Sequence, residues 1–293
     1  MRLNKFVFIV FLGCSILSAP AFSESQEILD DFWLLENYQP PLNSLWLYGG
    51  IDDDSGDYYG LSTNLAINSS LYFDFSATRQ NYTYKTDDVS LGMSGKLGEQ
   101  FNWAVSRMFW GKKDSLEKND SRFSVMYFYN NFNSNLSFET GKIELFLDQP
   151  NILQINSLLS DHRAVELSLG YGWGYDWGQL YSEIKYKQHD YQTRWPGAIS
   201  RSAIFIFASS IGLQQARSLA DNESSLLIGF QQQTISYEIL FSQLDSAFSN
   251  NTFTYASLSL SKSLNPQWQL GVNAEIPLDE GLYTLGMSLG YMW

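Results

Sequence analysis

Cysteine is almost absent from this sequence: Cys14 is the only one in 293 residues. It lies in an N-terminal segment that we expect to be removed on export, which would leave a chain with neither disulfides nor thiolate metal sites. Lys and Arg are also scarce, at 18 against 31 Asp and Glu, and the formal net charge is −13. This charge argues against nucleic acid as a partner, because phosphate binding depends on Lys and Arg side chains.

Long hydrophobic runs are missing as well. No stretch reaches the ~18–20 consecutive apolar residues of a membrane-spanning helix. Aromatic residues, in contrast, are abundant, with 9 Trp, 18 Tyr and 20 Phe. An aromatic-rich chain without spanning helices favours a transmembrane β-barrel, with a secreted β-sandwich as the alternative. Glycine-rich phosphate-binding motifs and HExxH motifs are absent from the sequence too, so we expect no cofactor.

Residues 1–23 have the features of a cleaved secretory signal peptide. Arg2 and Lys5 precede an apolar centre over residues 6–12, and small residues at the end of the segment offer a cleavage site. A lipoprotein signal is the alternative, because Leu-Gly-Cys at 12–14 resembles a lipobox. Export across the inner membrane follows from both interpretations.

Residues 24–43 differ in composition from the rest of the chain. They carry five acids and the pair Pro40-Pro41, and proline pairs interrupt helices and strands alike. We expect a lead-in on the periplasmic side. Residues 44–293 are then expected to form a single domain.

Large apolar side chains recur at every second position through this domain, and the last segment shows the pattern most clearly. Small or polar residues stand between them. A period of two places the two sets on opposite faces of a β-strand. The large residues of this last segment are Tyr283, Leu285, Met287, Leu289, Tyr291 and Trp293.

This terminal pattern resembles the closing strand of bacterial outer-membrane β-barrel proteins, whose chains typically end in an alternating strand with a terminal aromatic. The resemblance implies an outer-membrane location in a Gram-negative cell. It also implies recognition of this strand by the barrel-assembly machinery, and contact with outer-membrane lipids and lipopolysaccharide. In a closed barrel the last strand should pair with the first, near residues 45–51. The oligomeric state stays open.

The connections between alternating segments differ regularly in length. Short ones near 68–69, 98–100, 130–134, 176–178, 232–233 and 263–266 alternate with longer ones near 53–57, 80–86, 111–120, 145–162, 190–200 and 244–251. Outer-membrane barrels have short periplasmic turns and longer outer loops. The sequence therefore predicts an all-β fold, a single closed antiparallel transmembrane β-barrel.

A literal count gives fifteen segments, which conflicts with the even strand number of such barrels. Two changes would bring the number to about fourteen. Either residues 201–214 belong to an outer loop, or 223–243 form one long, bulged strand. Twelve strands with longer loops is the alternative.

Charged residues on the strands fall on the face opposite the apolar one. In hydrocarbon each would cost about 2–4 kcal/mol near the midplane, so we expect them to face a polar, mixed-charge lumen. The residues predicted to face inward are Asp74, Glu139, Glu166, Glu183, Lys185, Lys187, Glu238 and Glu275.

Two features raise the possibility of lipid-modifying chemistry. His162 and His189, the only histidines, are expected near the outer ends of strands, as solvated loop residues or as the base of a phospholipase-like hydrolase. The segment IDDDSGDYYG resembles the first hairpin of Ca²⁺-dependent lipid A 3′-O-deacylases, although Asp52 stands where that family has Asn and no Thr follows Tyr59. The resemblance implies a Ca²⁺ loop, whose candidate carboxylates are Asp52, Asp53, Asp54 and Asp57.

No Ser/His/acid arrangement accompanies these histidines, since neighbours in a strand point to opposite faces. We therefore assign no catalytic residue. The sequence favours a non-enzymatic barrel, either a small-solute pore or a surface or structural protein. A barrel-type lipid A deacylase or phospholipase-like enzyme using loop carboxylates and His162 or His189 is the alternative.

Overall fold

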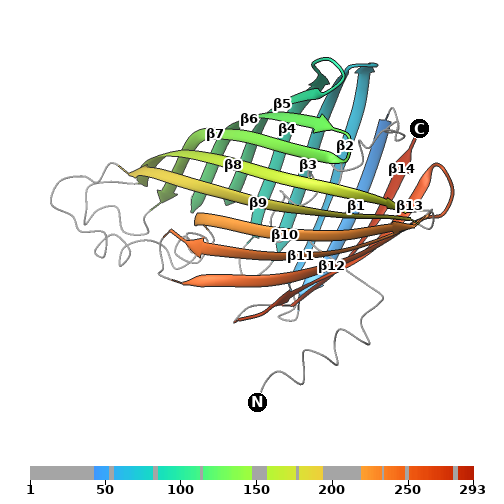
Figure 1. Ribbon diagram of the computed structural model, residues 1–293. Helices are drawn as coiled ribbons and strands as arrows, with labels where there is room; N and C mark the ends of the chain where they lie inside the picture. The colour runs from blue at the N-terminus through green and yellow to red at the C-terminus, as the bar shows by residue number, and fades with distance from the viewer. Residues whose placement is uncertain are drawn as a thin grey trace.

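The computed structural model is a closed antiparallel β-barrel of 14 strands in sequence order (Figure 1). It describes residues 43–52, 56–81, 85–112, 115–146, 157–175, 178–193, 219–232, 234–247, 251–279 and 283–293. The predicted signal peptide and nearly all of the lead-in thus lie outside the described residues. Within the described ranges, no helix is long and apolar enough to span a membrane.

The first seven strands lie between Asn43 and Phe146. They are β1 (Asn43–Asp52), β2 (Asp57–Asn68), β3 (Leu71–Asn81), β4 (Lys85–Lys96), β5 (Phe101–Lys112), β6 (Leu116–Tyr129) and β7 (Phe132–Phe146). The remaining seven lie between Ser157 and Met292. They are β8 (Ser157–Tyr175), β9 (Gly178–Thr193), β10 (Ala220–Gln232), β11 (Ile235–Ser246), β12 (Thr252–Ser263), β13 (Trp268–Pro277) and β14 (Thr284–Met292).

The barrel is closed by pairing of its first and last strands, as the sequence predicted. β1 and β14 pair antiparallel from Ser44 opposite Met292 to Asp52 opposite Thr284. At the end of this seam, the backbone amides of Asn43 and Trp293 each donate to the carbonyl of the other at 3.2 Å. No strand edge is therefore left open, which is the condition for a strand structure in a membrane.

Fourteen strands confirm the preferred count, and the twelve-strand alternative is wrong. So is the interpretation of 223–243 as one strand, because β10 ends at Gln232 and β11 begins at Ile235. Residues 201–214, the other ambiguous segment, lie outside the described residues between β9 and β10.

One end of the barrel carries the predicted short turns and is called the turn end. Its connections include 69–70, 130–131 and 233–234. The opposite, loop end was expected to carry longer connections, but three of these intervals are short, namely 53–56, 82–84 and 113–115. The last of them is short because β5 and β6 extend further than their apolar alternation indicated.

The outward face carries the predicted apolar side chains. Leu91, Val105, Phe123, Phe138 and Val165 are all exposed and lie on neighbouring strands β4 to β8. The large residues of the terminal strand have the same orientation, and Met287 is 56% exposed. A band of this kind is stable in hydrocarbon and unfavourable in water.

Strands β6 to β9 are the longest and extend beyond this apolar band at the loop end (Figure 1). Above the band, the outward positions become polar across four paired strands, with Ser121, Thr140, Arg163 and Asp190 in one register row. The outward face of this extension is therefore polar, and its inward face carries charged side chains together with the buried Leu116 and Ile143, which is why it lacks the alternation of a membrane strand.

Aromatic rings lie across glycines inside the barrel, near the β1–β14 seam. A Cβ atom at Gly60 would lie 2.7 Å from the ring of Tyr48, and one at Gly290 would lie 2.6 Å from the ring of Trp46. These glycines are required because any side chain would displace the ring from the neighbouring strand. The Tyr48 hydroxyl lies 2.6 Å from the Thr78 hydroxyl, which fixes the ring over β2 and β3.

Candidate functional site in the barrel lumen

The eight charged residues expected to face inward occupy lumen-facing positions of their strands. Glu139, Glu166, Lys187, Glu238 and Glu275 are buried, and the other three are half-buried. The structure brings three of them together: Lys187 contacts Glu139, and Arg122 lies between Glu139 and Glu166. Asp74, Glu238 and Glu275 lie on other strands, each in a separate environment.

Arg122 of β6 joins three of the lumen strands. Its Nη2 lies 2.7 Å from Glu166 Oε1, and its Nε lies 3.8 Å from Glu139 Oε1. Glu139 also receives the ammonium of Lys187 at 2.9 Å. All four side chains are buried, so each charge is balanced at short range by one of opposite sign rather than by water.

The two histidines continue this arrangement toward the loop end. Asp120 Oδ2 lies 2.8 Å from His162 Nδ1, His162 Nε2 lies 2.9 Å from His189 Nδ1, and His189 Nε2 lies 2.7 Å from Glu223 Oε1. His162 is fully buried and His189 is 5% exposed. The expectation of solvated loop histidines is therefore wrong: both belong to strands and face the lumen.

These four side chains form a continuous row of contacts across the barrel wall. The row begins at Asp120 on β6, passes through His162 on β8 and His189 on β9, and ends at Glu223 on β10. Tyr191 stacks against both rings and donates its hydroxyl to the carbonyl of Ala220 at 2.6 Å, so it supplies no proton to them.

We call these contacts together the ionic cluster. The cations Lys118, Arg122 and Lys187 stand against the four carboxylates of Asp120, Glu139, Glu166 and Glu223. Its members are Lys118, Asp120, Arg122, Glu139, His162, Glu166, Lys187, His189 and Glu223.

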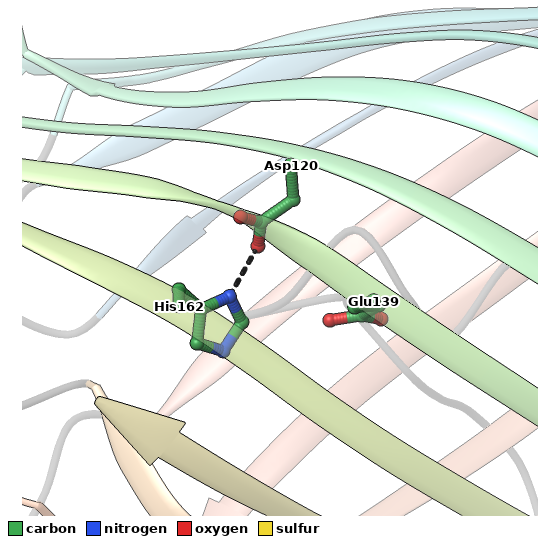
Figure 2. Close-up of side chains that lie close together, drawn as sticks. All are labelled: Asp120, Glu139 and His162. Carbon is green, nitrogen blue, oxygen red and sulfur yellow. Dashed lines mark hydrogen bonds and ion pairs between the residues drawn. The ribbon is translucent and has the colours of Figure 1, made fainter. Parts of the chain in front are cut away.

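Three members of the cluster lie close enough to share a metal ion (Figure 2). Asp120, Glu139 and His162 offer ligand atoms within 4.8 Å of one another, and the figure shows Asp120 and His162 turned toward each other. Ammonium groups already stand beside both carboxylates, however, with Lys118 3.1 Å from Asp120 and Lys187 2.9 Å from Glu139. Each of the two carboxylates thus already has a cation beside it, so we assign no metal.

The Ca²⁺ loop suggested by the sequence is only partly described. Asp53 and Asp54 lie outside the described residues. Asp52 is buried on the lumen side, where it accepts the backbone amide of Gly56 at 2.6 Å. Asp57 is exposed and pairs with Ile51 on the outward face. The structure therefore does not bring these two carboxylates onto one face.

The described lumen divides into two parts according to charge. On β4 to β10, which we call the ion-paired half, inward bases and acids occur together and the ionic cluster dominates. On β11 to β14 and β1 to β3, which we call the acid-only half, the described lumen-facing positions include no Lys or Arg. Their charged residues are Asp52, Asp74, Glu238 and Glu275.

Neutral donors hold the carboxylates of the acid-only half. Asp74 accepts the amide of Asn64 at 2.5 Å and the hydroxyl of Ser94 at 2.9 Å. Glu238 accepts the Tyr181 hydroxyl across the boundary between the halves. The acceptor oxygens of these side chains are thus satisfied by neutral groups.

A cavity of about 180 Å³ lies between the two halves, toward the turn end of the ionic cluster. Serine hydroxyls are its commonest lining groups, and Trp46 and Tyr48 contribute aromatic surface. Its charged lining residues are Asp74, Arg122, Glu166, Glu183 and Lys185. The lining also includes apolar residues such as Phe75, Met108 and Met126, and the cavity is large enough for several waters or a small solute.

Sequence reasoning missed Lys118, Asp120, Arg122 and Glu223. The first two fall in 111–120, which was expected to be a loop, and Arg122 adjoins it. Lys118, Asp120 and Arg122 do stand at every second position of the sequence, but the residues between them are also polar, so the sequence does not show which set faces inward. Only the register of β6 against β7 and β8 identifies which of these charges meet.

No protein-family model and no curated protein matches the sequence. Among solved structures, the chain is similar to the outer membrane protein Omp33 of Acinetobacter baumannii, with a TM-score of 0.53 and 7% identity over 86% of this chain and 98% of that one. The toluene transporter TodX of Pseudomonas putida aligns with a TM-score of 0.49 and 8% identity, over 94% of this chain and 93% of that one. Because the sequence identity to Omp33 is only 7%, this similarity shows a shared fold and nothing about function.

Proposed function

We propose that this chain, which has the fold of bacterial outer-membrane β-barrel proteins, is a non-enzymatic outer-membrane channel for small polar solutes. The single observation that carries this proposal is the hydroxyl-lined cavity enclosed by the closed barrel. A barrel that serves only as a membrane anchor can fill its lumen with side chains, as small barrels do. Here the serine hydroxyls of the cavity wall leave open space, although apolar residues such as Ile143 and Leu227 are buried at other inward positions.

The proposal includes a location and an orientation. Short turns face the periplasm in outer-membrane barrels, so the turn end and the cavity would lie on the periplasmic side. The ionic cluster would then form the narrow part of the passage near the cell surface. Export through a cleaved signal peptide at 1–23, contact with lipopolysaccharide, and recognition of residues 283–293 by the assembly machinery belong to the same proposal.

The side-chain contacts of the two histidines support the proposal that the channel is not an enzyme. A general base needs a ring nitrogen that faces the reacting group. All four ring nitrogens of His162 and His189 are occupied by Asp120, Glu223 or each other. Both rings are also buried, away from the outward face where lipid would lie.

Single-channel recording in planar lipid bilayers tests the channel. We expect discrete conductance steps from the refolded protein, and a clear reduction in step size when Ser106 on the cavity wall is changed to Phe. The matched control is Ser182→Phe, since Ser182 faces outward on β9. Absence of steps from protein that shows the heat-modifiable migration of a folded barrel would exclude the channel.

A further inference from the structure

The charge distribution of the lumen bears on which solutes the proposed channel accepts. Basic residues do occur on the strands of the acid-only half, namely Arg79 of β3 and Lys262 of β12, but both occupy outward positions. Every charged residue at the described inward positions of these seven strands is an acid. The fixed charge of this wall is therefore negative.

The ion-paired half does not offset this negative field at the cavity. Arg122, its most central cation, lies 2.7 Å from Glu166 and 3.8 Å from Glu139. Lys185 is the other base on the cavity wall, and Glu183 lies two positions before it on the same face of β9. Each of these cations thus has an acid beside it, and their fields largely cancel beyond a few ångströms.

Asp74 is the cavity acid whose described partners are all neutral. Each of its oxygens accepts one hydrogen bond, from the Asn64 amide and from the Ser94 hydroxyl. Its side chain is half-buried on the cavity wall, three strands from Arg122 in the same register row through Gly92 and Ser106. Its negative charge therefore acts on the cavity without a neighbouring base to neutralise it.

We infer that the lumen selects for cations, and that Asp74 is the residue that determines this selectivity. A passage lined by one sign of charge between low-dielectric walls raises the local concentration of the opposite ion. The solute class is small inorganic or organic cations that fit among the serine hydroxyls around Asp74. This inference rests on the proposed channel and specifies what passes through it.

Reversal potentials across a bilayer with a KCl gradient test this inference. The wild-type channel should show a potential of the sign for K⁺ over Cl⁻. Asp74→Asn keeps the size of the side chain and removes its charge. It should lower the permeability ratio by roughly 25-fold, about fivefold from the weaker attraction of K⁺ and about fivefold from the weaker repulsion of Cl⁻, when one unit charge ~4 Å from the ion path is removed in a water-like dielectric.

Two further variants make the assay specific. Asp190→Asn removes an exposed, outward-facing carboxylate of β9 and should leave the ratio unchanged. Lys185→Gln removes a cavity cation and should raise the ratio, so the inference stays testable even if Asp74→Asn fails to fold. If the Asp74→Asn protein folds and its permeability ratio is unchanged, Asp74 does not determine the selectivity.

The possible failures of the inference and of the channel itself are distinguishable. A conducting wild-type protein that is unselective or prefers Cl⁻ would overturn cation selectivity and leave the channel intact. Folded protein without conductance would overturn the channel and, with it, this inference.

Discussion

The two halves of the lumen stabilise buried charge by different means. In the ion-paired half, Arg122, Lys187 and the histidines connect carboxylates of neighbouring strands at 2.7–2.9 Å. In the acid-only half, tyrosine rings lie over glycines, and amides and hydroxyls hold the carboxylates. The first arrangement makes a wall neutral and specifies its register, whereas the second leaves a net field in the lumen.

This difference predicts unequal costs for removing one side chain. Loss of one member of a buried ion pair leaves an uncompensated charge, which is far more costly than loss of a bond between neutral groups. Substitutions matched across the two halves therefore test whether the division by charge also describes how the barrel is stabilised.

Arg122→Ala should have the largest effect. It leaves Glu139 and Glu166 buried without their guanidinium, at a cost of about 3–5 kcal/mol in the free energy of unfolding. Urea titration in lipid vesicles, followed by tryptophan fluorescence, measures this. The double variant Arg122→Met with Glu166→Gln should recover part of the loss. A single variant as stable as the wild type would contradict the ionic cluster as a stabilising element.

Tyr58→Phe should have an intermediate effect in the acid-only half. The variant keeps the ring against the seam and removes the hydroxyl that accepts the Asn273 amide at 3.3 Å. Because both partners are neutral, we expect a loss of about 1 kcal/mol in the same urea titration. A loss equal to that of Arg122→Ala would show that the two halves do not differ in the way their charges suggest.

Arg79→Gln should have the smallest effect. Arg79 pairs with Asp87 at 2.6 Å on the outward face, and both side chains are more than half exposed. Solvent screens such pairs, so the midpoint of urea unfolding should hardly move. A shift comparable to that of Arg122→Ala would mean that ion pairing itself, rather than its burial, stabilises this barrel.

Much of this fold was predictable because a membrane strand repeats with a period of two. The alternation of Tyr283 to Trp293 identified the closing strand, and its pairing with β1 is confirmed. The strand number required a correction in the region of 201–214 and 223–243, because the apolar residues 203–208 do not alternate clearly. The correction came from the requirement that such barrels have an even number of strands, and the predicted number of fourteen strands is confirmed.

The ionic cluster was not predictable from the same signal. In the extension of β6, Asn119 and Ser121 face outward into a polar surrounding, so no apolar residue marks one face of the strand. The histidines were misplaced for the same reason, because polar sequence near His162 resembles a loop. Which charges meet depends on register over separations such as the 44 residues between Arg122 and Glu166.

The seam between β1 and β14 also has a consequence for folding kinetics. Asn43 and Trp293 are 250 positions apart, and hydrogen bonds along the seam join residues of similar separation. Contacts of such high contact order form slowly, since the intervening chain must first be ordered. Until they form, β1 and β14 each expose an unpaired edge that can template aggregation. The closing of the seam is therefore also the step at which association with other chains competes with folding.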